Sequence, residues 1–252
     1  MGKVRKPFQG VFNIIRFNRH FYILASLLIT ILFFAAHYFH NPFRFYIELV
    51  CVIIIGLSLI SLLISFYIYD LSGLYDLKWL NHEEPSDTIL NINAGFDETS
   101  HLLQHQYPNS RLIVLDFYDP LKHTEISLTR ARKAYPPYHG TLQINSNKIP
   151  LSDQYADKIF LLFAAHEIRD SIERIIFFNE LNRILKPDGK IILTEHLRDP
   201  ANFVAYTIGF FHFYSKKTWL NTIMSAGLSV QSEKKPTPFI STFILVKDGN
   251  TI

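Results

Sequence analysis

Two long apolar stretches near the N-terminus constrain what this chain can fold into more than any other feature. Residues 21–39 contain no Asp, Glu, Lys or Arg, and residues 45–69 contain only Glu48. Each stretch is long enough to cross roughly 30 Å of hydrocarbon as a helix. The connection between them, residues 40–44, is so short that the two helices should form a hairpin with both chain ends on the same side of a membrane.

The charges around the first stretch indicate which side that is. The stretch is not typical of a cleaved signal peptide, because its apolar run is too long and no small-residue cleavage site follows. Five basic residues and no acidic one precede it, whereas the connection holds only Arg44. The positive-inside rule therefore places both chain ends in the cytoplasm. We expect a two-span protein of a bacterial inner membrane, with residues 1–69 as leader and hairpin and residues 70–252 as the cytoplasmic domain.

Residues 7–19 have two interpretations. The combination of Phe8, Phe12 and Ile15 with Arg16 or Arg19 is typical of a helix at a membrane interface. An irregular basic leader explains the same residues equally well.

Charge and cysteine content exclude several classes of function. Residues 1–69 hold six basic residues and one acidic residue, which leaves 19 basic and 21 acidic residues in the remainder. This balance gives no support for a nucleic-acid partner. The only cysteine, Cys51, lies in the second apolar stretch, so the chain has no disulfide framework and no cysteine-based metal site.

After residue 87 the apolar pattern becomes that of an α/β domain. The runs rich in β-forming residues are 88–93, 111–116, 140–145, 157–165, 189–196, 227–233 and 239–247. Helical patterns lie between most of them, and the clearest covers 167–185. Its expected apolar stripe consists of Ile168, Ile172, Ile175, Ile176, Leu181 and Ile184. The alternation predicts a doubly wound, mostly parallel seven-stranded sheet, with the last two runs as an antiparallel pair at its edge.

Three segments occur in the order found in one known family. The sequence "FFNELNRILKPDGKIILTEH" at 177–196 is similar to its helix, turn and fifth strand. Residues 147–168 resemble its approach to the fourth strand, and residues 69–80 resemble the segment that precedes the first strand and helps to cover the cofactor. Together, over residues 69–247, they resemble the class I methyltransferases that use S-adenosylmethionine, which have a Rossmann-like fold. The resemblance implies S-adenosylmethionine as cofactor.

The expected cofactor turn departs from the family pattern. The chain reads "LNINAGFD" at 90–97 where the family reads approximately "LDIGCGTG". Asn91 replaces an acid, and Asn93 and Asp97 replace glycines; Asn tolerates positive φ but lacks the charge of Asp. Asp116 is expected to hold the ribose hydroxyls, although it can also be a helix cap or loop acid. The cofactor-binding residues that the resemblance implies are Asn91, Asn93, Ala94, Gly95, Asp116, Phe117 beside the adenine ring, and Asn145 at the adenine edge.

Methyl transfer from a sulfonium is an in-line displacement, so the protein needs a base only when the acceptor is protonated. The candidate catalytic residues follow the fourth and fifth strands and are His166, Glu167, Glu195 and His196. Each of them can instead cap a helix or face solvent. The sequence "HEIRD" at 166–170 approaches a metalloprotease pattern, but a second histidine and a third ligand are missing, so we expect no metal.

Residues 197–220 contain seven aromatic residues around three basic ones. This composition suits a segment at a membrane interface or one that lines an apolar pocket, and a core helix explains part of it. With the hairpin, it predicts two partners: the bilayer and a lipophilic small molecule such as a lipid, quinone or pigment precursor. Two alternatives stay open: a methyltransferase-like scaffold that has lost its cofactor, and an S-adenosylmethionine enzyme that does not methylate.

Overall fold

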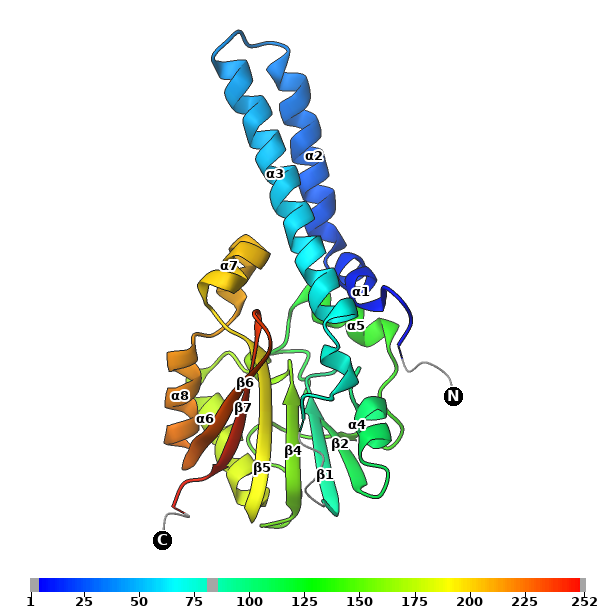
Figure 1. The fold of residues 1–252 in the computed structure, drawn as a ribbon, viewed down its shortest axis with the longest axis vertical. Helices are drawn as coiled ribbons and strands as arrows, with labels where there is room; N and C mark the ends of the chain where they lie inside the picture. Colours follow the sequence, from blue (N-terminus) through cyan, green and yellow to red (C-terminus); the bar gives the residue numbers. More distant parts are fainter. Residues whose placement is uncertain (1–4, 81–85, 250–252) are drawn as a thin grey trace.

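The computed structural model describes residues 5–80 and 86–249, and it shows a seven-stranded α/β domain from one end of which a long helical hairpin projects (Figure 1). The strands are β1 (Thr88–Asn93), β2 (Arg111–Asp116), β3 (Leu142–Gln143), β4 (Ala156–Leu162), β5 (Leu185–His196), β6 (Leu228–Thr237) and β7 (Ile240–Lys247). Their order is β3-β2-β1-β4-β5-β7-β6, with β7 antiparallel to β5 and β6 and the other neighbours parallel. The predicted doubly wound sheet with an antiparallel edge pair is confirmed.

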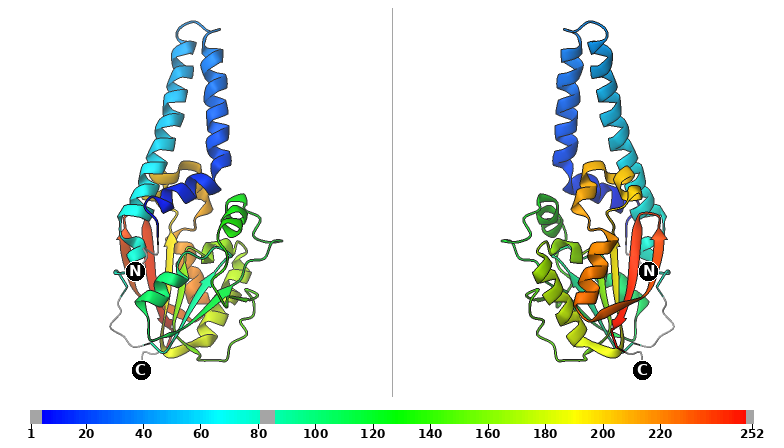
Figure 2. Two further views of the ribbon diagram at one scale, coloured as in Figure 1. Left: turned by 90° about the vertical axis from the view of Figure 1, so that its right-hand side faces the viewer. Right: turned by 90° about the vertical axis from the view of Figure 1, so that its left-hand side faces the viewer.

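The N-terminal region is helical. The two arms of the hairpin, α2 (Arg19–Ala36) and α3 (Phe43–Phe66), are long and apolar enough to cross a membrane. They are preceded by α1 (Gln9–Phe17), which crosses the base of the hairpin (Figure 2). Segment 7–19 is therefore mostly helical, and its Phe8 and Phe12 side chains are 51% and 63% exposed.

Asp70 closes the base of the hairpin. It lies in the π-helical turn η1 (Tyr67–Leu71), directly after α3. Its two carboxylate oxygens accept hydrogen bonds from the backbone N–H groups of Gly10 and Val11, each at 2.8 Å. A carboxylate is favourable there because the first N–H groups of a helix have no partners within the helix. The chain before α2 and the chain after α3 are thus joined to each other.

Two apolar layers cover the sheet. The larger one lies between the sheet and the helices α6 (Ser171–Ile184) and α8 (Lys216–Ser225), where Phe177 and Trp219 are fully buried. The smaller one lies on the opposite face, under α4 (Ser100–Gln106). Because successive side chains of a strand point to opposite faces, β4 supplies both layers, which explains its continuous apolar run.

The remaining described helical elements lie around the carboxyl end of the sheet or just after α3. They are η2 (Leu74–Asp76), α5 (Ile126–Ala134), η3 (Ala165–Glu167), α7 (Pro200–Tyr206) and η4 (Thr207–His212).

The helix expected over 167–185 is shorter, and its buried face differs from the prediction. It begins at Ser171, and Ile172 and Ile176 are 68% and 39% exposed, so the predicted stripe is wrong for these two residues. The buried face includes Arg174, whose guanidinium carbon lies 4.2 Å from the ring centroid of Tyr214. An arginine that is paired in this way can occupy a position that the apolar pattern assigns to isoleucine.

Candidate active site

The candidate site lies at the carboxyl end of the parallel strands, which is the end from which the hairpin projects (Figures 1 and 2). Asn93 and Asp116, the last residues of β1 and β2, are aligned in register. His196 ends β5, and its Nε2 lies 2.7 Å from the hydroxyl of Tyr69 in η1, directly after the hairpin. Doubly wound sheets bind their ligands at this end.

Asn91 holds the turn after β1 in place. Its side chain is buried, and its Nδ2 donates to Oγ1 of Thr99 at 3.0 Å and to Oγ of Ser100 at 2.8 Å. Oδ1 of Asp97 accepts the backbone N–H groups of the same two residues, each at 2.9 Å. The two substitutions in the family pattern therefore tie the turn to the start of α4.

Gly95 is the point of closest approach in this turn. Its φ is +91°, and a Cβ there would lie 2.9 Å from Cβ of Tyr118. Its N–H donates to Oδ1 of Asn93 at 2.9 Å, and Ala94 between them is buried. A side chain is therefore excluded at this position both by the backbone conformation and by the lack of space.

Two polar atoms of the turn are available for a ligand. Among the described residues, Nδ2 of Asn93 and Oδ2 of Asp97 are buried and have no hydrogen-bond partner. Buried polar atoms are rarely left unpaired in folded proteins. The residues present in the turn thus fit a bound polar group such as the cofactor.

Asp116 is fully engaged by the protein. It is 2% exposed; its Oδ2 accepts from Nη1 of Arg132 at 2.5 Å, and its Oδ1 accepts from the backbone N–H of Tyr118 at 2.8 Å. The sequence analysis did not identify Arg132, a half-exposed residue of α5. The carboxylate expected to hold the ribose is thus present at the end of β2, where it forms an ion pair with Arg132.

Phe117, which was expected beside the adenine ring, lies in the core. Phe117 is only 2% exposed, and its ring packs against Phe177 in the core at a centroid distance of 5.2 Å. We therefore assign the Phe117 ring to the core rather than to a contact with adenine, because the ring points into the layer between the sheet and the helices and is covered there by Phe177. Asn145 is exposed, and its Oδ1 accepts from the backbone N–H of Asn147 at 3.2 Å.

Helix α1 covers the turn through Glu98, a residue that the sequence analysis missed. Glu98 Oε1 accepts from Nδ2 of Asn13 at 2.9 Å and from Nε2 of Gln9 at 3.1 Å. Its Oε2 accepts from the hydroxyl of Tyr75 at 3.2 Å and lies 3.3 Å from Nη1 of Arg5. The leader before the hairpin is thereby part of the wall of the site.

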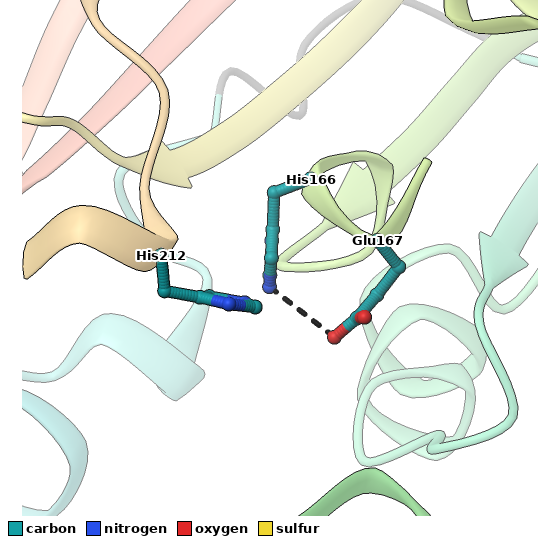
Figure 3. Close-up of side chains that lie close together, drawn as sticks. All are labelled: His166, Glu167 and His212. Carbon is teal, nitrogen blue, oxygen red and sulfur yellow. Dashed lines mark ion pairs between the residues drawn. The ribbon is translucent and has the colours of Figure 1, made fainter. Parts of the chain in front are cut away.

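The acceptor side of the site is built around His166. Its Nδ1 lies 2.7 Å from Oε2 of Glu195, and its Nε2 lies 3.4 Å from Oε1 of Glu167. The backbone N–H of His166 also donates to Glu195, at 3.2 Å. Figure 3 shows that His212, the last residue of η4, lies on the other side of the His166 ring from Glu167. The structure thus brings three of the four expected catalytic residues together and adds His212.

These contacts set the protonation states. Burial alone would lower the pKa of His166, but the charges and hydrogen bonds of Glu195 and Glu167 raise it well above its usual value. Burial would raise the pKa of Glu167, but His166 lowers it to about 2. Between these pKa values His166 is a cation held between two carboxylates.

His196, the fourth expected catalytic residue, faces inward. Its Nε2 contacts the Tyr69 hydroxyl, and its Nδ1 lies 3.0 Å from Oδ1 of Asn202. Burial lowers the pKa of His196 to about 4, so the ring is neutral at neutral pH. Because both of its ring nitrogens are engaged by the protein, we assign it the role of a positioning residue, which differs from the role of base that the sequence suggested.

Comparison with known proteins identifies the domain. Residues 90–193 match the model of a family described as a methyltransferase domain, a segment that runs from β1 into β5 and includes the cofactor turn, Asp116 and His166. No curated protein sequence matches the chain significantly.

Several solved structures share the fold. A SAM-dependent methyltransferase from Aquifex aeolicus is 18% identical over 75% of this chain and 97% of its own, with a TM-score of 0.51. The PH0226 protein from Pyrococcus horikoshii OT3 is 15% identical over 72% and 89%, with a TM-score of 0.50. A candidate O-methyltransferase from Nostoc punctiforme is 14% identical over 76% and 59%, with a TM-score of 0.52. Residues 90–193 therefore match a methyltransferase domain, and the three solved structures share the fold of this chain.

Proposed function

We propose that the enzyme is anchored in a membrane by the hairpin and methylates a lipophilic acceptor, such as a lipid, a quinone or a pigment precursor. The observation that carries this proposal is the segment α7–η4. It presents Phe203, Ile208 and Phe211 to the outside with 53%, 76% and 64% of each side chain exposed, and it ends at His212 in the acceptor site. An exposed apolar surface of this kind beside a catalytic site marks a contact with lipid or with an apolar ligand.

The position of this segment supports the same reading. Helix α7 lies against α3, at the end of the domain where the hairpin emerges (Figure 1). The exposed Phe8 side chain stacks on Phe66, the last residue of α3, and exposed Phe12 contacts the Phe8 ring. A bilayer crossed by α2 and α3 would therefore meet apolar side chains from two further elements. Together with the basic residues before the first span, this arrangement supports a domain on the cytoplasmic side.

On the donor side, we propose that Asn91, Asn93, Ala94 and Gly95 form the floor of the cofactor site. When it is bound, S-adenosylmethionine supplies a methyl group on a positively charged sulfur. The free Nδ2 of Asn93 and Oδ2 of Asp97 are the protein atoms best placed to hold its polar groups.

Two further donor-side residues complete the proposed site. Asp116 would hold the ribose hydroxyls once Arg132 yields or shares its carboxylate, and exposed Asn145 remains the candidate for the adenine edge.

On the acceptor side, the four expected catalytic residues divide into two pairs. His166 and Glu167 converge with His212 and are the groups proposed to contact the acceptor. Glu195, which is 1% exposed, fixes the ring of His166. His196 does not reach the acceptor and instead links β5 to Tyr69.

Binding of the cofactor product tests the donor site. Isothermal titration of S-adenosylhomocysteine into the detergent-solubilised full chain should show one site per chain. Asp116→Asn should weaken binding about tenfold, because a charged acceptor of two hydroxyl hydrogen bonds becomes neutral. Asp188→Asn, at an exposed position near the start of β5, is the matched control and should not change binding. A normally folded protein that gives no heat would favour the scaffold alternative.

The acceptor is tested by its product. Lipid extracts of cells with and without the protein are compared by mass spectrometry, and the expected difference is an apolar species heavier by one CH₂. If the only changed species are water-soluble, the lipophilic acceptor is wrong. If an apolar species changes by another mass, the enzyme uses the cofactor for a reaction other than methylation.

A further inference from the structure

Three side chains of the acceptor site converge on one point. A ring nitrogen of His166, a carboxylate oxygen of Glu167 and a ring nitrogen of His212 all lie within 4.8 Å of one another (Figure 3). Nε2 of His166 lies 3.4 Å from Oε1 of Glu167. The three ligand atoms come from two turns, η3 and η4, which are separated by residues 168–206 and meet only in the folded chain.

Nδ1 of each of the two histidines, His166 and His212, contacts a carboxylate. Nδ1 of His166 lies 2.7 Å from Glu195, and Nδ1 of His212 lies 2.7 Å from Oε1 of Glu125. Histidines that bind metals almost always donate their second ring N–H to a carboxylate or a carbonyl, which fixes the tautomer and aims the other nitrogen at the metal. This cluster has that arrangement twice.

We propose that His166, Glu167 and His212 bind one divalent first-row transition metal ion, with Zn²⁺ as the reference ion. Two imidazoles and one carboxylate suit zinc and its neighbours better than Mg²⁺ or Ca²⁺, which prefer oxygen ligands. Three protein ligands also leave at least one coordination position open, as in catalytic rather than structural zinc sites. All three side chains are half-buried, so a small ligand can reach that position.

Binding requires defined proton positions. The ion replaces the proton on Nε2 of His166, and it selects the tautomer of His212 in which Nδ1 carries the proton and donates to Glu125. Nη2 of Arg169 lies against the same Nδ1, and because a guanidinium only donates, it must move towards Glu125, 3.7 Å away, when Nδ1 carries the proton. The charge of Arg169 acts on both Glu125 and Glu167.

The role of the ion rests on the proposed function. A hydroxyl group of the acceptor that binds at the open position loses its proton to solvent more readily, because the cation stabilises the oxyanion. The oxygen then forms a bond to the methyl carbon while the carbon–sulfur bond breaks, and the electron pair of that bond goes to sulfur to give a neutral thioether.

Metal binding is measured directly on the full chain in detergent. The protein is stripped with a chelator, dialysed and titrated with ZnCl₂ by calorimetry, and Co²⁺ is added in parallel to read the ligand geometry from its visible absorption. We expect one ion per chain. His212→Ala and Glu167→Gln should each weaken Zn²⁺ binding at least tenfold, and Glu195→Gln should weaken it 10- to 100-fold as a supporting residue. His105→Ala, an exposed histidine of α4, is the control and should bind normally.

The outcomes separate this proposal from the proposed function. Zn²⁺ binding that is absent, or that is unchanged by both His212→Ala and Glu167→Gln in normally melting proteins, overturns the metal site even if S-adenosylhomocysteine still binds. Zn²⁺ binding that depends on these residues in a protein that binds no S-adenosylhomocysteine supports the metal site and counts against the methyltransferase function. Glu167→Gln is nearly isosteric, so it keeps the test decisive if His212→Ala fails to fold.

Discussion

The hydroxyl of Tyr69 lies 2.7 Å from Nε2 of His196, and this contact joins the segment after the hairpin to the last residue of β5. His196 also bonds Asn202 at the start of α7, so one buried imidazole contacts the elements before and after the catalytic strand end. In the neutral ring, Nδ1 donates to the amide oxygen of Asn202 and Nε2 accepts from the Tyr69 hydroxyl.

Stability should therefore fall in mild acid. The pKa of His196 is about 4 in the folded protein and about 6.5 in the unfolded chain. Below pH 6.5 the unfolded chain therefore binds a proton at His196, whereas the folded protein does not bind it until the pH approaches 4. The contribution is fully present above pH 6.5, is lost as the pH falls towards 4, and amounts to at most about 3 kcal/mol. Thermal unfolding of the wild type and of His196→Gln across this range checks it. A variant that loses stability as steeply as the wild type would contradict the assignment.

Gly95 offers a test of close approach against a matched control. Gly95→Ala should cost about 1–3 kcal/mol and abolish binding of S-adenosylhomocysteine, because the new Cβ meets Tyr118 at a positive φ. Gly140 has a comparable φ of +79° but nothing within 4 Å of an added Cβ. Gly140→Ala should therefore carry only the backbone cost and keep full binding. Equal binding losses in the two variants would argue against a special role for the turn.

Arg132 should compete with the cofactor for Asp116. Its guanidinium contacts the carboxylate that is expected to take the ribose hydroxyls, and Arg132 is half-exposed and can move. Arg132→Met should tighten binding of S-adenosylhomocysteine by about three- to tenfold, although it leaves a buried carboxylate without its cation and lowers the melting temperature. Calorimetry and a melting curve on the same sample measure both effects. Weaker binding by this variant would mean that Arg132 is itself a cofactor contact.

The proposed membrane contact of α7–η4 can be read from local polarity. In a Cys51→Ala background, which removes the only cysteine, Phe211→Cys and Met224→Cys each receive a polarity-sensitive fluorophore. Both side chains are well exposed, at 64% and 67%, but Met224 lies on α8 away from the hairpin. In lipid nanodiscs the label at position 211 should emit at shorter wavelength than the label at position 224. Identical spectra at the two positions would contradict the contact.

The strands could be predicted because their signals are local. β1 and β2 have the expected bounds, since each is a short β-rich run that a turn ends. The run 140–145 yields only the two-residue β3, because it lies at the sheet edge and pairs with β2 alone. Strand β5 begins at Leu185 rather than at 189, since the "LKPDG" turn extends along β4.

The site was less predictable because its contacts are distant in sequence. No pattern around "HEIRD" indicates that His212, beyond β5, approaches His166, and so the expectation of no metal could not anticipate the cluster. Likewise Glu98 binds Asn13 across 85 positions, and only the folded hairpin brings them together. Phe117 was placed by its sequence neighbour Asp116, whereas the alternation of a strand turns its ring into the core.

The two hydrogen bonds from α1 to Asp70 join the two ends of the hairpin to each other. A single helix with a free linker would let the domain tilt and move away from the bilayer. Here the segments before α2 and after α3 are hydrogen-bonded to each other where they enter the domain. For the proposed membrane enzyme, the depth of the acceptor site relative to the lipid surface is then constant. The enzyme would then select acceptors by the distance between their reactive group and their apolar tail.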